Sequence, residues 1–206
     1  MPNVLLRSRR TSVLRAALIL LLFVSGSYLC GAQEPEPDKP IVMSKPKLPF
    51  VQKDVCPFEC CTYRHWTATK PTLLYQSWKR SGRKVIGSVR KGERVLAATG
   101  VVVTYRPSRF RARQNVNDLD LKIGDEFPAY AYRGEGVFDF WNKGKFYQGE
   151  IYGQNHCAKG DPDFQSPTCV VEDGEFEWWA QVTTQAGRKG WVWMDKARFD
   201  NVDACS

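Results

Sequence analysis

Histidine is scarce in this 206-residue chain, which holds only His65 and His156. The sequence also lacks the G-x-S-x-G turn of serine hydrolases and the H-E-x-x-H pair of zinc proteases. His65 adjoins a tryptophan in an expected strand, and His156 adjoins a cysteine in an expected loop, so we interpret both as packing or surface residues. We therefore predict that the protein is not an enzyme and that it has no catalytic residue, no metal and no cofactor.

Acidic residues are absent before Glu34, whereas four arginines precede the apolar run 16–24: Arg7, Arg9, Arg10 and Arg15. A basic stretch followed by a short apolar run and small residues is typical of a secretory signal peptide. The run is shorter than the roughly 20 residues that span a bilayer. Small residues at Cys30 and Ala32 place the expected cleavage after residue 32, and an uncleaved anchor extending through residues 25–32 is the alternative. We expect an exported protein, periplasmic or extracellular, that meets the membrane only transiently through this signal peptide (residues 1–32).

The formal net charge of +8 invites a nucleic-acid interpretation, but half of it belongs to the four arginines of the expected signal peptide, which leaves 8 − 4 = +4. Zinc-finger spacing and RNP-type aromatic motifs are missing, so no nucleic-acid partner is expected. The remaining charge is divided along the chain. Residues 79–113 hold eleven basic groups and one acid, whereas residues 114–206 hold nine basic and sixteen acidic groups.

Five of the chain's 12 prolines lie in residues 33–50, among Glu, Asp and Lys. Proline at this density blocks helices and central strands, so we predict a disordered proline-rich tether there. From Cys56 onward no stretch keeps a helical period, and short apolar or alternating runs are separated by turn residues. The expected strands are 64–69, 72–75, 85–89, 94–99, 101–106, 126–133, 137–141, 145–152, 177–184 and 190–194. The predicted fold class is all-β.

Two pairs of segments resemble a bacterial SH3 domain. Residues 72–75 with 84–95 (KVIGSVRKGERV) are similar to its first half, and residues 177–179 (EWW) with 188–192 (RKGWV) are similar to its closing half. Residues 56–64 (CPFECCTYR) resemble the opening of exported bacterial proteins built on this domain. The resemblance implies a small SH3-like β-barrel over residues 51–206, with long loop and strand insertions because the region between the two halves exceeds what a minimal barrel needs.

Six cysteines lie beyond the expected signal peptide: Cys56, Cys60, Cys61, Cys157, Cys169 and Cys205. An even number in an exported domain indicates disulfides, with 15 connectivities open for three bridges. We predict Cys157–Cys169, which closes a Gly/Pro/Asp-rich loop. A bridge between the adjacent Cys60 and Cys61 would strain the peptide between them. We therefore predict Cys60–Cys205, which ties the start of the domain to its end, and Cys56–Cys61.

Two alternatives involve chemistry at specific residues. A metal site could draw on Cys56, Cys60, Cys61, His65, His156 and Cys157, but the C-x3-C-C spacing lacks the paired C-x2-C knuckles of structural zinc sites. A glycosidase needs two carboxyl groups, and acids stand at strand spacing in Asp118/Asp120 and Glu175/Glu177. We interpret these acids as a solvated face.

Aromatic residues are numerous, with seven Trp, eight Tyr and eleven Phe, and they either fill gaps in a small barrel or lie partly at its surface. Neighbouring Trp178 and Trp179 face opposite sides of a strand, whereas Trp191 and Trp193 share one side. Exposed rings beside charge suit a binding surface. The predicted contact surface joins the loop 106–113 to three tryptophans, and its residues are Arg106, Arg109, Arg111, Trp141, Trp179 and Trp191.

By resemblance, we expect a non-enzymatic exported binding or accessory module of the cell envelope that contacts peptidoglycan or a protein partner. An enzyme inhibitor, or an envelope hydrolase-type enzyme with an unrecognised site, is the alternative. A structural assembly subunit is a third possibility.

Overall fold

The computed structural model describes residues 41–42, 44–151, 155–157 and 166–205, and these residues form β-strands with two short 3-10 turns. The predicted all-β, barrel-like class is confirmed. The expected signal peptide and residues 33–40 of the expected tether lie outside the described residues. Among the residues described, no helix is long and apolar enough to cross a membrane.

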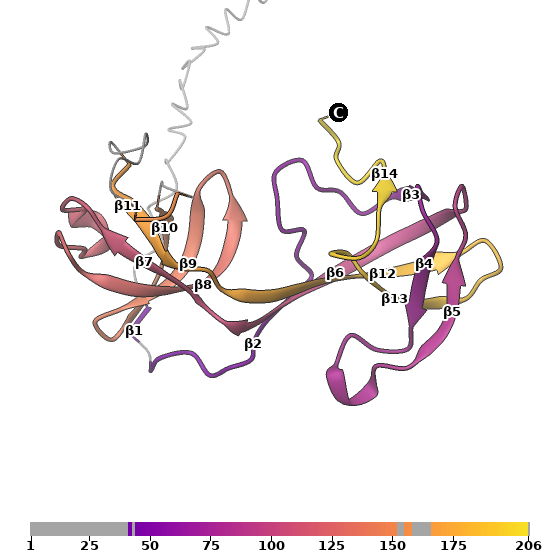
Figure 1. Ribbon diagram of the computed structural model, residues 1–206, viewed down its shortest axis with the longest axis horizontal. Coiled ribbons are helices and arrows are strands. Elements are labelled where there is room, and N and C mark those ends of the chain that lie inside the picture. The colour runs from indigo at the N-terminus through magenta and orange to yellow at the C-terminus, as the bar shows by residue number, and fades with distance from the viewer. Residues whose placement is uncertain (1–40, 43, 152–154, 158–165, 206) are drawn as a thin grey trace, which may run out of the picture. The chain divides into compact units, whose positions relative to one another are not determined.

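Figure 1 labels the strands in the order in which they follow one another along the chain. They are β1 (Ile41–Val42), β2 (Phe50–Lys53), β3 (His65–Ala68), β4 (Thr72–Tyr75), β5 (Val85–Val89), β6 (Arg94–Arg106), β7 (Ser108–Ala112), β8 (Glu126–Gly134), β9 (Val137–Asn142), β10 (Lys145–Glu150), β11 (Thr168–Glu172), β12 (Glu175–Thr184), β13 (Lys189–Trp193) and β14 (Phe199–Asp200). The 3-10 turns are η1 (Arg80–Gly82) and η2 (Asn117–Leu119).

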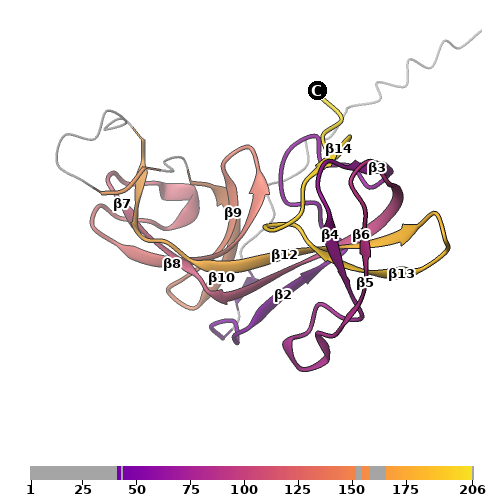
Figure 2. The ribbon, with the colours of Figure 1, turned by 45° about the vertical axis from the view of Figure 1, so that its right-hand side comes forward.

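Two sheets, each with its own apolar core, make up this part of the chain (Figure 2). The first has the order β1-β10-β9-β8-β7-β11. The second has the order β14-β3-β6-β12-β13-β4-β5, and β2 pairs with β6 in addition. Trp66, Leu74 and Val192 lie in the core of the second sheet, and Phe127 and Phe140 lie in that of the first. The region expected as an insertion therefore forms a sheet with a core of its own.

The chain passes between the sheets along two neighbouring strands. β6 is 13 residues long and continues past Pro107 into β7, while β11 leads through a short turn into β12. β6 and β12 pair antiparallel from Arg106↔Glu175 to Val95↔Thr184. A single long ribbon thus belongs to the second sheet, and at its Arg106–Glu175 end both of its strands connect to strands of the first sheet.

The loop predicted over residues 106–113 is a strand. Ser108–Ala112 forms β7, and its alternate residues Phe110 and Ala112 are 3% and 1% exposed. Each apolar residue follows an arginine, so the local charge concealed an ordinary period of two. The strand β11, which lies next to β7, was not among the expected strands.

The C-terminal part of the predicted disordered tether is ordered. Residues 41–42 pair with β10, and Phe50 begins β2. The Phe50 ring packs against Tyr130 at 5.4 Å and against Phe146 at 6.0 Å between ring centroids. The backbone pairing of β1 with β10 and the packing of the Phe50 ring therefore attach this segment to the first sheet.

The three predicted disulfides are confirmed as Cys56–Cys61, Cys60–Cys205 and Cys157–Cys169, with Cα–Cα distances of 5.5, 5.5 and 5.1 Å. Asp203 lies close to the sulfurs of Cys60 and Cys205, but those sulfurs are joined to each other and are not thiolate ligands. Three intramolecular disulfides indicate an oxidising environment outside the cytoplasm.

Candidate functional site

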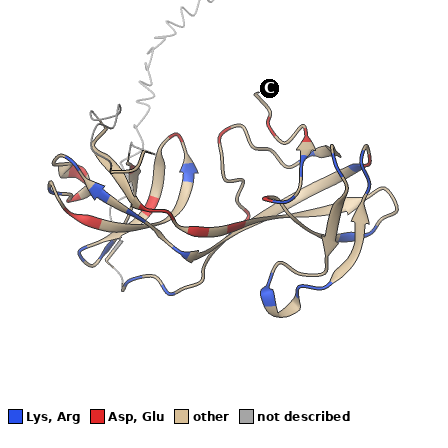
Figure 3. Ribbon diagram, viewed as in Figure 1, with Lys and Arg blue, Asp and Glu red and all other residues tan. Residues whose placement is uncertain are grey.

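The three arginines of the predicted contact surface lie at the end of β6 and on β7, where each is ion-paired. Arg106 Nη1 lies 2.6 Å from Glu172 Oε1, and Arg111 Nη2 lies 2.6 Å from Glu126 Oε1. Arg109 bridges the same two glutamates at 3.4 and 3.6 Å. Figure 3 shows basic segments of β7 beside acidic segments of β8 and β11. The charges of these three arginines are thus largely neutralised by Glu126 and Glu172.

The three predicted tryptophans do not share one surface. Trp141 lies on β9 of the first sheet, where the Lys45 ammonium stands 5.9 Å from its ring centroid. Trp179 and Trp191 lie on β12 and β13 of the second sheet, where Trp179 is 0% exposed and Trp191 is half-buried. The alternation of Trp191 and Trp193 opposite the buried Val192 is as expected. Trp179 is buried even though it points away from the core that contains Ala180.

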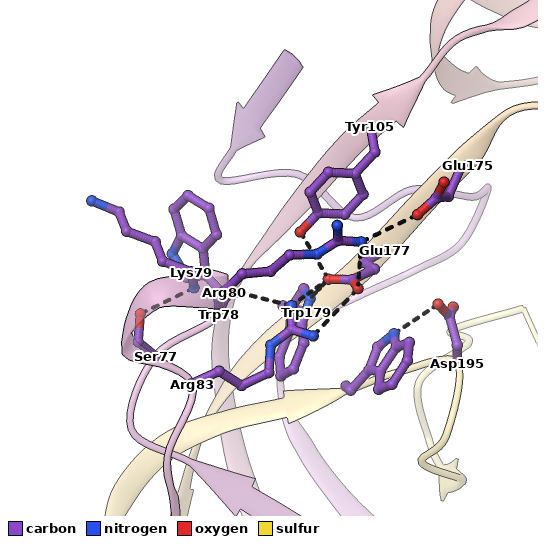
Figure 4. Close-up of polar contacts among 11 residues, drawn as sticks. Ser77, Trp78, Lys79, Arg80, Arg83, Tyr105, Glu175, Glu177, Trp179 and Asp195 are labelled. Atoms are coloured by element: carbon purple, nitrogen blue, oxygen red, sulfur yellow. Dashed lines mark hydrogen bonds and ion pairs between the residues drawn. The ribbon is translucent and has the colours of Figure 1, made fainter. Parts of the chain in front are cut away.

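A polar cluster covers Trp179, with the carboxylate of Glu177 at its centre (Figure 4). Arg83 Nη2 donates to Glu177 Oε2 at 2.5 Å, Trp179 Nε1 donates at 3.0 Å and the Tyr105 hydroxyl donates at 3.1 Å. Arg80 lies 3.6 Å from the other carboxylate oxygen and also binds Glu175 at 3.1 Å. The Arg80 guanidinium stacks 3.5 Å above the Tyr105 ring.

The cluster fixes the connection between β4 and β5 (residues 76–84) against the outer face of β12. Arg83 stacks 4.5 Å from the Trp179 ring centroid, and Tyr75 meets the same ring edge-on. Burial alone would raise the pKa of Glu177, but the hydrogen bonds from Arg83 and Trp179 outweigh it and lower that pKa. Glu177 is therefore ionised at neutral pH and engaged with its cationic partners.

A separate apolar groove of about 310 Å³ lies where β8 and β9 of the first sheet approach the long ribbon. β6 and β12 contribute Val102, Phe176 and Trp178, β8 and β9 contribute Tyr132 and Phe138, and the connection before β3 contributes Phe58. Phe176 is 59% exposed, whereas large apolar side chains of the cores are almost wholly buried. The groove therefore exposes aromatic surface that packing within the described residues does not cover.

The direction of the groove follows β12. Gly174, Phe176 and Trp178 line it in succession, and four residues of strand span about 13 Å. Arg106 marks one end, because it pairs with Glu175 in the ladder. Asp195 marks the other end, where the preceding Met194 donates its backbone N–H to the Trp178 carbonyl at 2.8 Å.

Two disulfides hold the wall that carries Phe58. Cys56–Cys61 closes the turn around it, and Cys60–Cys205 ties the same turn to the segment after β14. The Phe58 ring packs edge-on against Trp178 at 5.7 Å between centroids. The disulfides therefore hold the turn that carries Phe58, and ring packing seats Phe58 against Trp178 on the floor of the groove.

The remaining residues that were considered for chemistry lie apart from the groove. His65 is exposed on β3, and His156 Nε2 lies 3.0 Å from an Asp173 carboxylate oxygen in an exposed pair. Of the acid pairs, Glu175 and Glu177 bind Arg80 and Arg83 as described.

Sequence reasoning did not identify Phe58, Phe176 or Asp195 as site residues. The alternation of Phe176 and Trp178 was a usable signal, although the expected strand began only at residue 177, because both rings lie on the side of β12 opposite Glu177. Asp195 carried no local signal, since its role depends on how the turn after β13 lies against β12.

Comparison of the chain with models of protein families, with curated proteins and with solved structures finds no match.

Proposed function

We propose that this protein is an exported binding module of the cell envelope that holds an apolar, extended segment of a partner protein in the groove between β12 and the β8–β9 hairpin. The observation that carries the proposal is the aromatic lining of the groove along β12, where Phe176 is 59% exposed and Trp178 is partly buried. An envelope location, periplasmic or extracellular, is supported by the disulfides together with the expected signal peptide.

The chemistry of the lining favours a protein segment over a glycan. Sugar sites combine aromatic faces with several free hydrogen-bonding groups, whereas the Thr104 and Ser108 hydroxyls of this lining are already engaged. The Thr104 hydroxyl donates to the Tyr130 carbonyl at 2.6 Å, and the Ser108 hydroxyl accepts from the Gly174 N–H at 3.0 Å. An extended peptide with apolar side chains matches both the lining and the length of about 13 Å.

Site-specific photo-crosslinking tests the proposal. A benzophenone amino acid replaces Phe176 or Phe58, which line the groove, or Ile123, which is 69% exposed and lies outside it. The full chain is expressed and irradiated in the envelope of its native host. We expect the two groove positions to crosslink the same apolar segment of one protein, and position 123 not to crosslink it.

Digestion of the adducts distinguishes the classes of partner. An adduct that proteases remove and muramidase leaves intact supports a protein partner. An adduct that only muramidase removes would assign the groove to peptidoglycan. Different products at the two groove positions, or none, would overturn the proposed site.

A further inference from the structure

Among the residues that the structure describes, Asp195 has no counter-ion, and it lies at one end of an otherwise apolar groove. Its Oδ2 accepts a hydrogen bond of 2.8 Å from the Trp193 indole N–H, and its side chain forms no ion pair with any described residue. The residue as a whole is solvent-exposed, and it lines the groove beyond Trp178. A carboxylate with one neutral donor retains most of its capacity to accept hydrogen bonds.

The nearest cationic residues are directed elsewhere. The Lys196 ammonium lies over the Trp193 ring, 5.5 Å from its centroid. Arg198 donates to main-chain carbonyls, at 2.7 Å to Ala197 and at 3.5 Å to Asp195, and not to the carboxylate. The position in front of Asp195 is thus open to a cation supplied by a ligand.

The opposite end of the groove has no such opening. Arg106 donates to Glu172 and to the Asp173 carbonyl, each at 2.6 Å. Because that guanidinium is already paired, it offers little to an anionic ligand group. The Asp195 end therefore offers a negative charge to a ligand, whereas the Arg106 end offers little charge. This difference could set the direction in which a ligand lies in the groove.

We propose that the segment held in the groove carries a Lys or Arg side chain, and that its cationic head group binds the Asp195 carboxylate beside the Trp178 ring. This inference rests on the proposed function and specifies the chemistry of its partner. A cation placed there gains both a charge-assisted hydrogen bond and the face of an indole ring. It also fixes the direction in which an otherwise apolar segment lies along β12.

The electrostatic surroundings of Asp195 agree with this role. Burial raises the pKa of the Asp195 carboxyl, and the negative charge of Glu177 raises it further. The hydrogen bond from Trp193 and the positive charges of Lys196 and Arg198 lower the same pKa. The net shift is upward, so the surroundings of Asp195 oppose its ionisation in the folded protein without a ligand. A bound cation would reverse that penalty.

Peptide affinities measured by calorimetry on the purified, disulfide-bonded protein test the inference. The probes are acetyl-Lys-Leu-Phe-Val-amide, the same peptide with norleucine or Glu in place of Lys, and the three reversed sequences. We expect the Lys peptide to bind about tenfold more tightly than the norleucine peptide in one of the two directions. The Glu peptide should bind most weakly, and added salt should reduce the preference for Lys.

Asp195→Asn provides the matched variant, because the amide oxygen can still accept from Trp193. It should abolish the preference for Lys while leaving the thermal midpoint at pH 7 equal or higher. Asp200→Asn makes the same charge change on exposed β14, outside the groove, and should leave the preference intact.

The two proposals fail in different ways. Equal binding of the Lys and norleucine peptides, or a preference that survives Asp195→Asn, would overturn the role of Asp195 and leave the groove function standing. Binding of none of the peptides would overturn both.

Discussion

Glu177 illustrates how a charged residue is accommodated on a buried surface. Its side chain is 8% exposed, yet one guanidinium, one indole N–H and one phenol donate to it. A carboxylate with this many donors stays ionised despite burial, and it orients the arginines that cover Trp179. The residue is better understood as the anchor of loop 76–84 than as an acid available for proton transfer.

Glu177→Gln should lower the free energy of unfolding by about 2 kcal/mol, because it leaves the partly buried Arg83 without its counter-ion. Glu175→Gln makes the same change two residues away, where the side chain is 55% exposed, and should cost less than about 0.5 kcal/mol. Urea unfolding of both variants measures the difference. Equal losses would contradict the anchoring role of Glu177.

The difference in stability between wild type and Glu177→Gln should depend on pH in a defined direction. The pKa of Glu177 is lowered in the folded protein from its ordinary value of 4.5, so the stabilisation is complete above that value and is lost as the pH falls through the folded pKa. Wild type and Glu177→Gln should therefore converge in stability below pH 4.5. A gap that stays constant into strong acid would show that the charge is not its source.

At the scale of elements, local sequence patterns predicted most strands well. They did not predict which faces of the strands are covered by other parts of the chain. The bounds of β4 and β5 are those expected from residues 72–75 and 85–89, because apolar alternation and turn glycines act locally. β7 was missed because arginines separate its buried residues. The burial of Trp179 could not be predicted, since it depends on a loop folding back over the outer face of the sheet.

At Gly174, which lines the groove, the backbone before β12 passes close to the backbone between β6 and β7. A Cβ at this position would lie 2.8 Å from the Arg106 carbonyl oxygen and 2.8 Å from the Ser108 nitrogen, both of which are backbone atoms. Gly174→Ala should therefore cost about 1–3 kcal/mol. Gly87→Ala is the control, because its nearest neighbour is the movable end of Arg188, and it should cost under about 1 kcal/mol. A smaller cost at 174 than at 87, measured in urea, would contradict this.

At the scale of the whole described molecule, the groove exists because one chain builds two sheets on a shared ribbon. The pairing of six of its cysteines and the positions of most strands were predictable from the sequence, because residue spacing and apolar alternation report on local geometry. The groove was not, since β12 meets the β8–β9 hairpin only after residues about 40 positions apart are brought together. The predicted surface of arginines and tryptophans failed to assemble for the same reason.

Binding in the groove can be read directly from the indole N–H signals of the seven tryptophans in a two-dimensional NMR titration with acetyl-Lys-Leu-Phe-Val-amide. Trp178 lines the groove and the Trp193 indole donates to Asp195, so these two signals should shift together. Those of Trp66, which is fully buried, and of Trp141 on the first sheet should not move. Shifts at Trp141 or Trp191 without any at Trp178 would place the ligand on a different surface and contradict the account.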